Sequence, residues 1–386
     1  MKRFLLATAA LLALAAPSAA HEPGKIEPRR LEFPKLADGR FALPVDLHTH
    51  SVFSDGAVWP NIRVEEARKD GLFAMAVTEH LEYQPHKADI PHPDRNRSYA
   101  LAIETETRIQ TEDTSAERQK LMVINGSEIT RLMPPGHVNA VFVTDANALL
   151  VADATEALRI ANAQGAFVFW NHPYWTSQTP DGVARLLPMH QQLIRDKLLH
   201  GIEVANGADM SDEAFKIALD NNLTILGTSD IHGLIDWDFD FANGVQRTAT
   251  LVLADAETPD AVKAALKAGR TVAVYKGSLV GRRENVEAVI RSTLRMEVGA
   301  ALERTTVVPV TFINTSPVDY QLENTGAQGF YDAPHHFRVK AHSSFTLIVK
   351  DVKDIAALNL TAKVLNTYVA PREHLTMTFR HSPKPN

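Results

Sequence analysis

Short apolar stretches alternate with amphipathic stretches between about residue 45 and residue 285. The apolar stretches have the length and composition of strands, and they cover residues 45–48, 73–77, 121–124, 138–143, 166–170, 202–205 and 224–226. Strands that alternate with helices are typical of βα units and a parallel sheet. Because no G-x-G-x-x-G motif follows the first strand, the pattern favours a distorted (β/α)7 barrel over an open dinucleotide-binding sheet.

Two helices of this region have predictable ends. Ser211 precedes an acidic first turn and an apolar stripe, so a helix is predicted to begin there. In a second helix Thr258 is the expected N-cap, Pro259 takes the first position and Gly269 follows the end. The barrel is assigned to residues 45–285.

The pattern changes after this barrel. Extended stretches follow with no convincing helix between most of them, at residues 306–313, 337–341, 344–349, 358–365 and 375–379. Residues 286–386 are therefore predicted to form a β-rich, sandwich-like domain. Its histidines follow no ligand spacing and are interpreted as surface or structural residues, at His335, His336, His342, His374 and His381.

The N-terminal residues have the pattern of a secretory signal. A positively charged start and an apolar run from Phe4 to Ala16 are followed by small residues up to Ala20. Residues 1–20 are therefore predicted to be cleaved, and the protein is expected to be periplasmic or secreted. Residues 21–44 contain four prolines and are predicted to form an extended arm. No other apolar run has the length of a membrane span, so no membrane anchor is expected.

Composition narrows the chemistry. The 386 residues have a formal net charge of −6, which argues against a dedicated nucleic-acid binder because no positive surplus faces a phosphate backbone. The chain has no cysteine and 16 histidines. Disulfides and thiolate metal sites are therefore excluded, and imidazole and carboxylate are left as candidate ligands.

The segment Asp46-Leu47-His48-Thr49-His50 contains the first candidate ligands. Alternate residues of an extended chain share a face, so Asp46, His48 and His50 are predicted to point together into the barrel mouth. An H-x-H pair alone is equally compatible with two hydrogen-bonded histidines and no metal. Recurrence favours a metal, because more imidazoles and carboxylates come at other predicted strand ends, namely Asp55, His80, Glu128, His137, His172, Asp230 and His232. Strand ends gather at one face of such barrels, so these residues are expected to converge.

With these motifs the chain resembles the PHP (polymerase and histidinol phosphatase) superfamily over about Val45 to Gly281. The resemblance implies a distorted seven-stranded barrel that holds two or three divalent metals, Mn²⁺, Zn²⁺ or Fe²⁺. It implies three ligand sets, namely His48, His50, Glu128 and Asp230; Glu128, His137 and His172; and Asp55, His80 and His232. Glu79 stands beside His80 where the family usually has aspartate, and it is placed behind the ligands because neighbours on a strand face opposite sides.

The resemblance also implies phosphoester hydrolysis by a metal-bound hydroxide. Glu128, Asp230 and Arg131 are the candidate catalytic residues, with Glu128 bridging two metals and Arg131 gripping a phosphoryl oxygen. Candidate substrate contacts come from the loops after the strands and are Arg131, Tyr174, Trp175 and Asn206. The export signal and the β-rich tail are similar to periplasmic PHP phosphodiesterases, so a small organophosphate diester is the predicted substrate.

Three other functions stay open. The protein is alternatively a phosphomonoesterase of the same family, an amidohydrolase-type lactonase or amidase, or a non-catalytic metal- or phosphate-binding protein. Amidohydrolases also open with H-x-H, but they usually need a bridging carboxylated lysine, and no predicted strand end offers one. The complete ligand set disfavours the non-catalytic alternative. The sequence indicates no oligomeric state.

Overall fold

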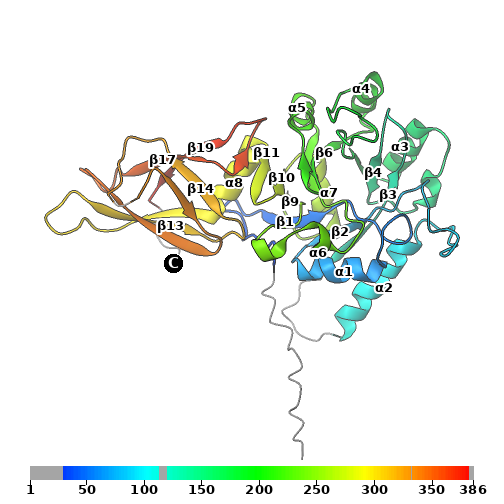
Figure 1. Ribbon diagram of the computed structural model, residues 1–386, viewed down its shortest axis with the longest axis horizontal. Coiled ribbons are helices and arrows are strands. Elements are labelled where there is room, and N and C mark those ends of the chain that lie inside the picture. Colours follow the sequence, from blue (N-terminus) through cyan, green and yellow to red (C-terminus); the bar gives the residue numbers. More distant parts are fainter. Residues whose placement is uncertain (1–28, 113–119, 332, 382–386) are drawn as a thin grey trace, which may run out of the picture.

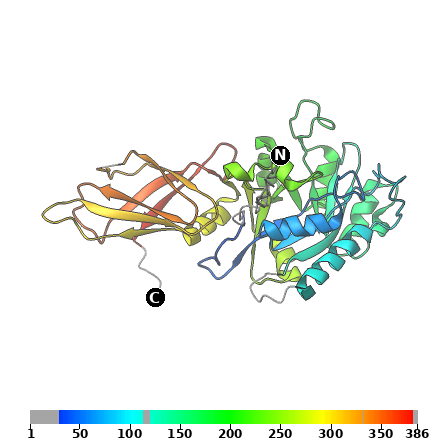
Figure 2. The same cartoon turned by 60° about the horizontal axis from the view of Figure 1, so that its bottom comes forward.

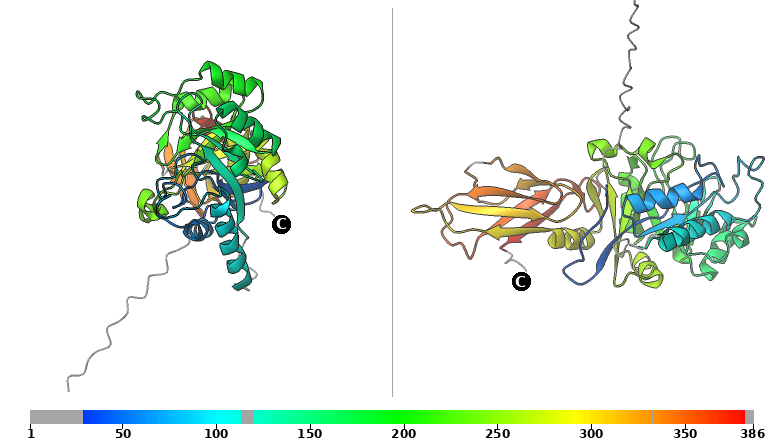
Figure 3. Two further views of the ribbon diagram at one scale, coloured as in Figure 1. Left: turned by 90° about the vertical axis from the view of Figure 1, so that its right-hand side faces the viewer. Right: turned by 90° about the horizontal axis from the view of Figure 1, so that it is seen from below.

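The computed structural model describes residues 29–112, 120–331 and 333–381. Two bodies lie end to end, a larger one built from strands and helices and a smaller all-β one (Figures 1 and 3). The predicted signal at residues 1–20 lies outside the described residues. Among the described residues, no helix has both the length and the apolar character needed to cross a membrane.

The larger body is built on one mixed sheet that curls into a half-barrel (Figure 1). The sheet has 12 strands in the order β18-β11-β10-β9-β1-β2-β3-β4-β5-β6-β7, and β8 pairs with β6. The strands are β1 (Phe41–Asp46), β2 (Ala74–Val77), β3 (Met122–Ile129), β4 (Val138–Val141), β5 (Phe167–Trp170), β6 (Gly201–Asn206), β7 (Asp209–Met210), β8 (Thr224–Thr228), β9 (Ala249–Ala254), β10 (Thr271–Tyr275), β11 (Ser278–Gly281) and β18 (Thr367–Tyr368).

Helices between these strands cover the outside of the sheet, and α1 and α2 lie side by side (Figure 2). The helices are α1 (Pro60–Lys69), α2 (Arg97–Glu112), α3 (Ala154–Ala163), α4 (Pro188–Arg195), α5 (Asp212–Asp220), α6 (Ile235–Asp238), α7 (Pro259–Lys267) and α8 (Arg283–Thr293), with the 3₁₀ turns η1 (Asn147–Leu149) and η2 (Phe241–Asn243). The predicted ends of α5 and α7 are confirmed. The side chains of Ser211 and Thr258 accept hydrogen bonds from backbone N–H groups of the first turn, and Gly269 takes a positive φ of 66° after α7.

The barrel prediction is confirmed, and all seven predicted strands are present, but the sheet is not all parallel. β4 runs antiparallel to both β3 and β5. Only residues 130–137 join β3 to β4, which is too short for the crossover that a parallel pair needs. β9, β10 and β11 form an antiparallel extension that the strand pattern did not predict.

The predicted N-terminal arm is too long at its C-terminal end. Phe41 to Pro44 belong to β1, where they pair antiparallel with β9. Pro44 lacks an N–H group, but its carbonyl accepts a hydrogen bond of 2.7 Å from the backbone N–H of Phe73. The acceptor of Pro44 is therefore used, although β1 is an interior strand, where proline is uncommon.

Side chains close the gap between β8 and its neighbours β9 and β10. The hydroxyl of Thr250 on β9 donates to the carbonyl of Gly227 on β8 (2.7 Å), and the N–H of Gly227 donates back to that hydroxyl oxygen (3.0 Å). A Cβ atom at Gly227 would lie 2.8 Å from the Cβ of Ala273 on β10. Glycine therefore allows the two sides of the barrel to approach closely.

The smaller body is a sandwich of two antiparallel sheets, β12-β13-β16 and β15-β14-β17-β19. Its strands are β12 (Leu294–Val298), β13 (Val308–Asn314), β14 (Tyr320–Asn324), β15 (His336–Val339), β16 (Ser343–Val349), β17 (Asn359–Val364) and β19 (Leu375–Arg380). Buried and partly exposed residues alternate along β13 and β17, as expected for a sandwich. The predicted boundary after residue 285 falls within α8, which runs directly into β12. β18 joins the two bodies because it pairs with β11 of the barrel sheet.

Candidate metal centre

Nine side chains from strand ends and loops meet at one mouth of the barrel. They form four overlapping groups in which the potential ligand atoms lie within 4.8 Å of one another. The members are His48, His50, Asp55, His80, Glu128, His137, His172, Asp230 and His232. The structure therefore brings together all nine residues of the three ligand sets that the resemblance implies. The histidines of the C-terminal domain belong to none of these groups.

The first set lies at the end of β1. Nε2 of His48 and Nε2 of His50 are 3.0 Å apart, and each lies 3.1 Å from Oδ1 of Asp230. Each also lies 3.4 Å from Oε2 of Glu128. Ligand atoms about 2.1 Å from one tetrahedral cation are about 3.4 Å from one another. The four atoms therefore have the spacing of donors around a single divalent cation.

The other carboxylate oxygen of Glu128 serves a second set. Oε1 lies 2.8 Å from Nδ1 of His137 and 3.5 Å from Nε2 of His172. Glu128 is fully buried and offers one oxygen to each set. This is the geometry of a carboxylate that can bridge two cations and reduce their mutual repulsion.

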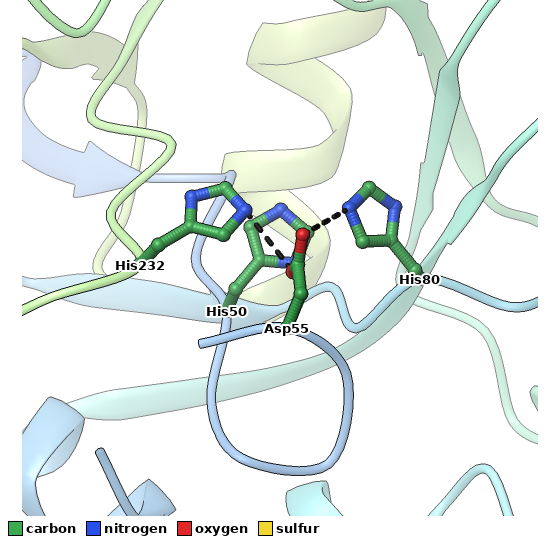
Figure 4. A group of neighbouring side chains, drawn as sticks. All are labelled: His50, Asp55, His80 and His232. Carbon is green, nitrogen blue, oxygen red and sulfur yellow. Dashed lines mark ion pairs between the residues drawn. The ribbon is translucent and has the colours of Figure 1, made fainter. Parts of the chain in front are cut away.

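The third set surrounds Asp55, which points between two imidazoles in Figure 4. Its Oδ1 lies 3.1 Å from Nε2 of His232, and its Oδ2 lies 3.4 Å from Nε2 of His80. The turn after Ser51 carries Asp55 into this position, because the N–H of Gly56 donates to the carbonyl of Ser51 (2.9 Å). A Cβ atom at Gly56 would lie 2.8 Å from the Ser51 backbone, so the turn requires glycine.

Three carboxylate oxygens of these sets are buried without a hydrogen bond. They are Oδ1 of Asp55, Oε2 of Glu128 and Oδ1 of Asp230. Burying an anionic oxygen is costly, and cations between these oxygens and the imidazole nitrogens that face them would reduce that cost. A donor set of nitrogen and oxygen without sulfur suits zinc, manganese and iron(II). The residues present therefore fit divalent cations.

The charges of the cluster shift one another's pKa. Burial acts to raise the pKa of Glu128, but the imidazoles of His80 and His48 hold it well below its usual range. Burial also acts to raise the pKa of Asp230, but His48 and His50 hold it below its usual range. Burial, together with nearby His232 and His80, lowers the pKa of His50 to about 3. These carboxylates are thus ionised and His50 is neutral near pH 7. Burial opposes protonation of His48 and His80, but Asp230 and Glu203 raise the pKa of His48, and Glu128 and Asp55 raise that of His80 to about 10, so a cation bound there would displace protons from these imidazoles.

Glu203 supports the ligands from behind, and the sequence analysis missed it. Its carboxylate is fully buried on β6. Oε1 lies 2.7 Å from Nδ1 of His48, and a proton shared there leaves the lone pair of Nε2 free to face the cluster. The hydroxyl of Thr228 also donates to Oε1, and the backbone N–H of His172 donates to Oε2, both at 2.7 Å. The sequence feature that could have identified Glu203 is a single carboxylate within an otherwise apolar strand. A buried carboxylate of this kind is tolerated only when it has hydrogen-bond partners.

Two further acids next to the ligands have structural partners. Glu79 lies behind the cluster, as expected, and accepts hydrogen bonds from the hydroxyls of Ser51, Ser54 and Ser98. The expectation that Asp46 points into the barrel mouth with His48 and His50 is wrong. Asp46 binds other groups instead, namely the hydroxyl of Ser229 (2.5 Å) and the guanidinium of Arg247 (2.7 Å).

Two members of the cluster have a strained backbone. The φ angle is +24° at His172 and +51° at Asp230, values that non-glycine residues rarely adopt. The N–H of Asp230 donates to the carbonyl of His48 (3.0 Å), which fixes the turn after β8. Strain of this kind is concentrated at functional sites, where the surrounding structure holds it.

A pocket of about 300 Å³ opens over the cluster. Its lining outside the nine residues comes from the segments after β5 and β6, and consists of Tyr174, Trp175, Thr176, Asn206 and Asp209. The predicted contacts Tyr174, Trp175 and Asn206 therefore face the pocket. The amide of Asn206 donates to Oδ2 of Asp230 (3.2 Å) and to Oε2 of Glu203 (2.9 Å), which ties the pocket wall to the cluster.

Arg131 takes a different place from the one predicted. Its guanidinium donates to the carbonyl of Val151 (2.6 Å) and pairs with Glu82 (2.8 Å). It is not among the residues that line the pocket. The sequence placed Arg131 three residues after Glu128 but could not show these partners, and we leave it out of the proposed substrate site.

Comparisons with known proteins agree with this arrangement. A family model described as an Ig-like domain matches residues 294–380. No match is found among curated proteins. A solved two-domain protein from Bacteroides vulgatus, containing a predicted PHP-like metal-dependent phosphoesterase, is 38% identical, with 91% of this chain and 98% of that chain covered and a TM-score of 0.81.

Two more distant structures also match. A provisionally named metal-dependent phosphoesterase from Bifidobacterium adolescentis is 18% identical over 49% of this chain and 87% of its own, with a TM-score of 0.35. PsfC from Pseudomonas syringae is 20% identical over 65% of this chain and 96% of its own, with a TM-score of 0.40. The identity and coverage of the Bacteroides protein, and not these two, decide the family. The chain belongs to the PHP-like metal-dependent phosphoesterases and combines their barrel with a C-terminal Ig-like domain.

Proposed function

We propose that this metal-dependent phosphoesterase hydrolyses small organophosphate diesters, outside the cytoplasm. The observation that carries the preference for diesters is the charge of the pocket wall. Among the described residues, no lysine or arginine lines the pocket. A phosphomonoester carries close to two negative charges near pH 7, whereas a diester carries one. A pocket without a guanidinium or ammonium group suits the less charged ester.

The size and lining of the pocket support the same proposal. About 300 Å³ is at the lower end of the range for small-molecule sites and leaves room for a compact ester. Tyr174 and Trp175 offer apolar surface for an organic group, and Asn206 offers an amide. Nucleic acid is a poor candidate, because the chain has a net charge of −6.

The chain's own residues would prepare the reaction in three ways. Glu203 orients His48, Glu128 presents an oxygen to each of two sets, and Asn206 fixes Asp230. Divalent cations held there would lower the pKa of a coordinated water and neutralise charge on the phosphoryl oxygens. Trp175, whose ring centroid lies 5.4 Å from those of His137 and His172, covers one side of the site.

Hydrolysis of three esters by reconstituted protein tests the proposal. Protein stripped with a chelator and reloaded with manganese or zinc is assayed against bis(p-nitrophenyl) phosphate, p-nitrophenyl phosphate and an aryl lactone. We expect kcat/KM to be highest for the diester and to follow metal content. A higher value for the monoester would support the phosphomonoesterase alternative, and turnover of the lactone alone would support an amidohydrolase. Metal-loaded protein that hydrolyses none of them would be a binding protein.

A further inference from the structure

The wall of the pocket carries one acidic side chain that the metal cluster does not use, Asp209. It lies on β7, which pairs with β6 in the register Asn206 to Asp209. Asp209 is exposed and lines the pocket, together with Tyr174, Trp175, Thr176 and Asn206. Each of these four neighbours is uncharged near pH 7. Asp209 is therefore the only charged group of the described lining outside the nine clustered residues.

The hairpin that carries Asp209 is held firmly in place. The hydroxyl of Tyr174 donates to the carbonyl of Asp209 (3.2 Å), and the hydroxyl of Tyr275 donates to the carbonyl of Ala208 (2.7 Å). The N–H of Gly207 donates to the carbonyl of Thr228 (2.9 Å), and the hydroxyl of Thr248 donates to the carbonyl of Gly207 (2.7 Å). These bonds attach the hairpin to β8 and to the segment before β9, so the position of Asp209 relative to the cluster is defined.

Among the residues that the structure describes, the carboxylate of Asp209 has no cationic partner. Within residues 29–112, 120–331 and 333–381, no lysine, arginine or histidine forms an ion pair with it. An acid on the wall of a site for an anionic ester repels the phosphoryl group, unless the same substrate also carries a positive charge. Trp175 adds a second attraction for such a charge, because 44% of its surface is exposed and indole attracts cations through its π face.

We propose that Asp209 and Trp175 select diesters in which the alcohol is cationic, such as an amino alcohol with a primary or quaternary ammonium group. This inference rests on the proposed diesterase function and deepens it by naming the substrate class. In the bound ester the phosphate lies over the cluster and the ammonium group lies against the wall formed by the segments after β5 and β6. A neutral alcohol of the same shape gains nothing from the carboxylate, so the charge decides the preference.

Two esters of the same shape test the preference. The first is p-nitrophenyl phosphocholine, and the second is p-nitrophenyl 3,3-dimethylbutyl phosphate, in which carbon replaces the quaternary nitrogen. Both release p-nitrophenolate, so the ratio of their kcat/KM values reports the charge alone. We expect the wild-type protein to favour the choline ester, D209N to lower the ratio about five- to tenfold, and W175L to lower it by a smaller factor. The control D220N removes an exposed carboxylate on α5, outside the pocket lining, and is expected to keep the wild-type ratio.

The outcomes separate this inference from the proposed function. A ratio that D209N leaves unchanged overturns the inference while the diesterase function stands. A loss of folded protein cannot produce the expected fall in the ratio, because it lowers both values equally. If neither diester is hydrolysed, the proposed function fails and calorimetric binding of phosphocholine and 3,3-dimethylbutyl phosphate decides the inference. Tighter binding of phosphocholine that D209N abolishes would support it, and equal binding of the two would overturn it.

Discussion

Replacing Glu203 by glutamine tests whether this buried acid controls the metal centre. The carboxylate accepts from four donors, two at each oxygen. Nδ1 of His48 and the hydroxyl of Thr228 face Oε1, whereas the N–H of His172 and the amide of Asn206 face Oε2, all at 2.7 to 2.9 Å. The amide nitrogen of a glutamine would face donors in either orientation. Near Oε1 it favours the tautomer of His48 that places a proton on Nε2, the atom that faces the cluster.

The expected effect follows from the loss of the charge and of one acceptor. Hydrogen bonds to a charged group contribute about 1.5–3 kcal/mol, against about 1 kcal/mol for a neutral pair. Substitution of a group that orients a metal ligand typically lowers metal affinity or activity about 10- to 100-fold, or about 1.4–2.7 kcal/mol. We therefore expect E203Q to lower metal affinity and kcat/KM within that range, with the fold retained.

Metal affinity is measured by competition with a chromophoric chelator, and folding by circular dichroism. The matched control is E106Q, which neutralises another buried carboxylate, bound to Arg68 at 2.8 Å on the helical side of the barrel. E106Q is expected to lower thermal stability but not metal affinity. If E203Q binds metal as tightly as the wild type and keeps its activity, the orienting role of Glu203 is refuted.

Three other predictions follow from particular contacts. H48A is expected to abolish hydrolysis and to lower bound metal in elemental analysis, whereas H374A, in the Ig-like domain, changes neither. G227A places a methyl group 2.8 Å from the Cβ of Ala273 and is expected to lower the free energy of unfolding by about 1–3 kcal/mol in urea, whereas G329A, with open space around it, has no such effect. Burial, with the charge of Lys267 nearby, lowers the pKa of His200 to about 4 in the folded protein. The unfolded chain, in which the pKa is about 6.5, therefore binds a proton more readily, and the free energy of unfolding falls as the pH is lowered from about 6.5 toward 4. H200N keeps an acceptor for the N–H of Val168 and is expected to lose less stability than the wild type over that pH interval, as measured by urea unfolding at stepped pH. An equal loss would show that His200 does not cause the pH dependence.

Most ligand positions were predictable because they lie at or just after the C-terminal end of a strand. His48 and His50 follow β1, Glu128 is the last residue but one of β3, and Asp230 follows β8. A barrel with these strand ends at one face therefore places the four residues together. This inference needs only the order of strands along the chain. It does not cover His137, which comes directly before β4 and lies at this mouth because β4 runs antiparallel to β3.

Contacts between distant side chains were not predictable in the same way. The partners of Asp46 and Arg131 lie on other elements, and both residues had a plausible place in the cluster from their sequence positions alone. Arg247, which binds Asp46, and Glu82, which binds Arg131, carry no motif that assigns them these roles. A charged side chain is assigned to a site reliably only when the groups that compete for it are known.

The net negative charge of the chain is compatible with the proposed anionic substrate, because acids gather where divalent cations would be held. Asp55, Glu128, Asp230 and Glu203 lie together at one mouth of the barrel, where their fields add in a poorly solvated environment. The facing imidazoles offset part of this negative charge, and divalent cations held among these groups would make the mouth attractive to phosphate. Once the cations are in place, the remaining negative charge of the wall lies at Asp209, at its edge. Under the proposed function, the reacting centre attracts the phosphate while Asp209 disfavours a second negative charge, so the same pocket would favour both a diester and a cationic alcohol.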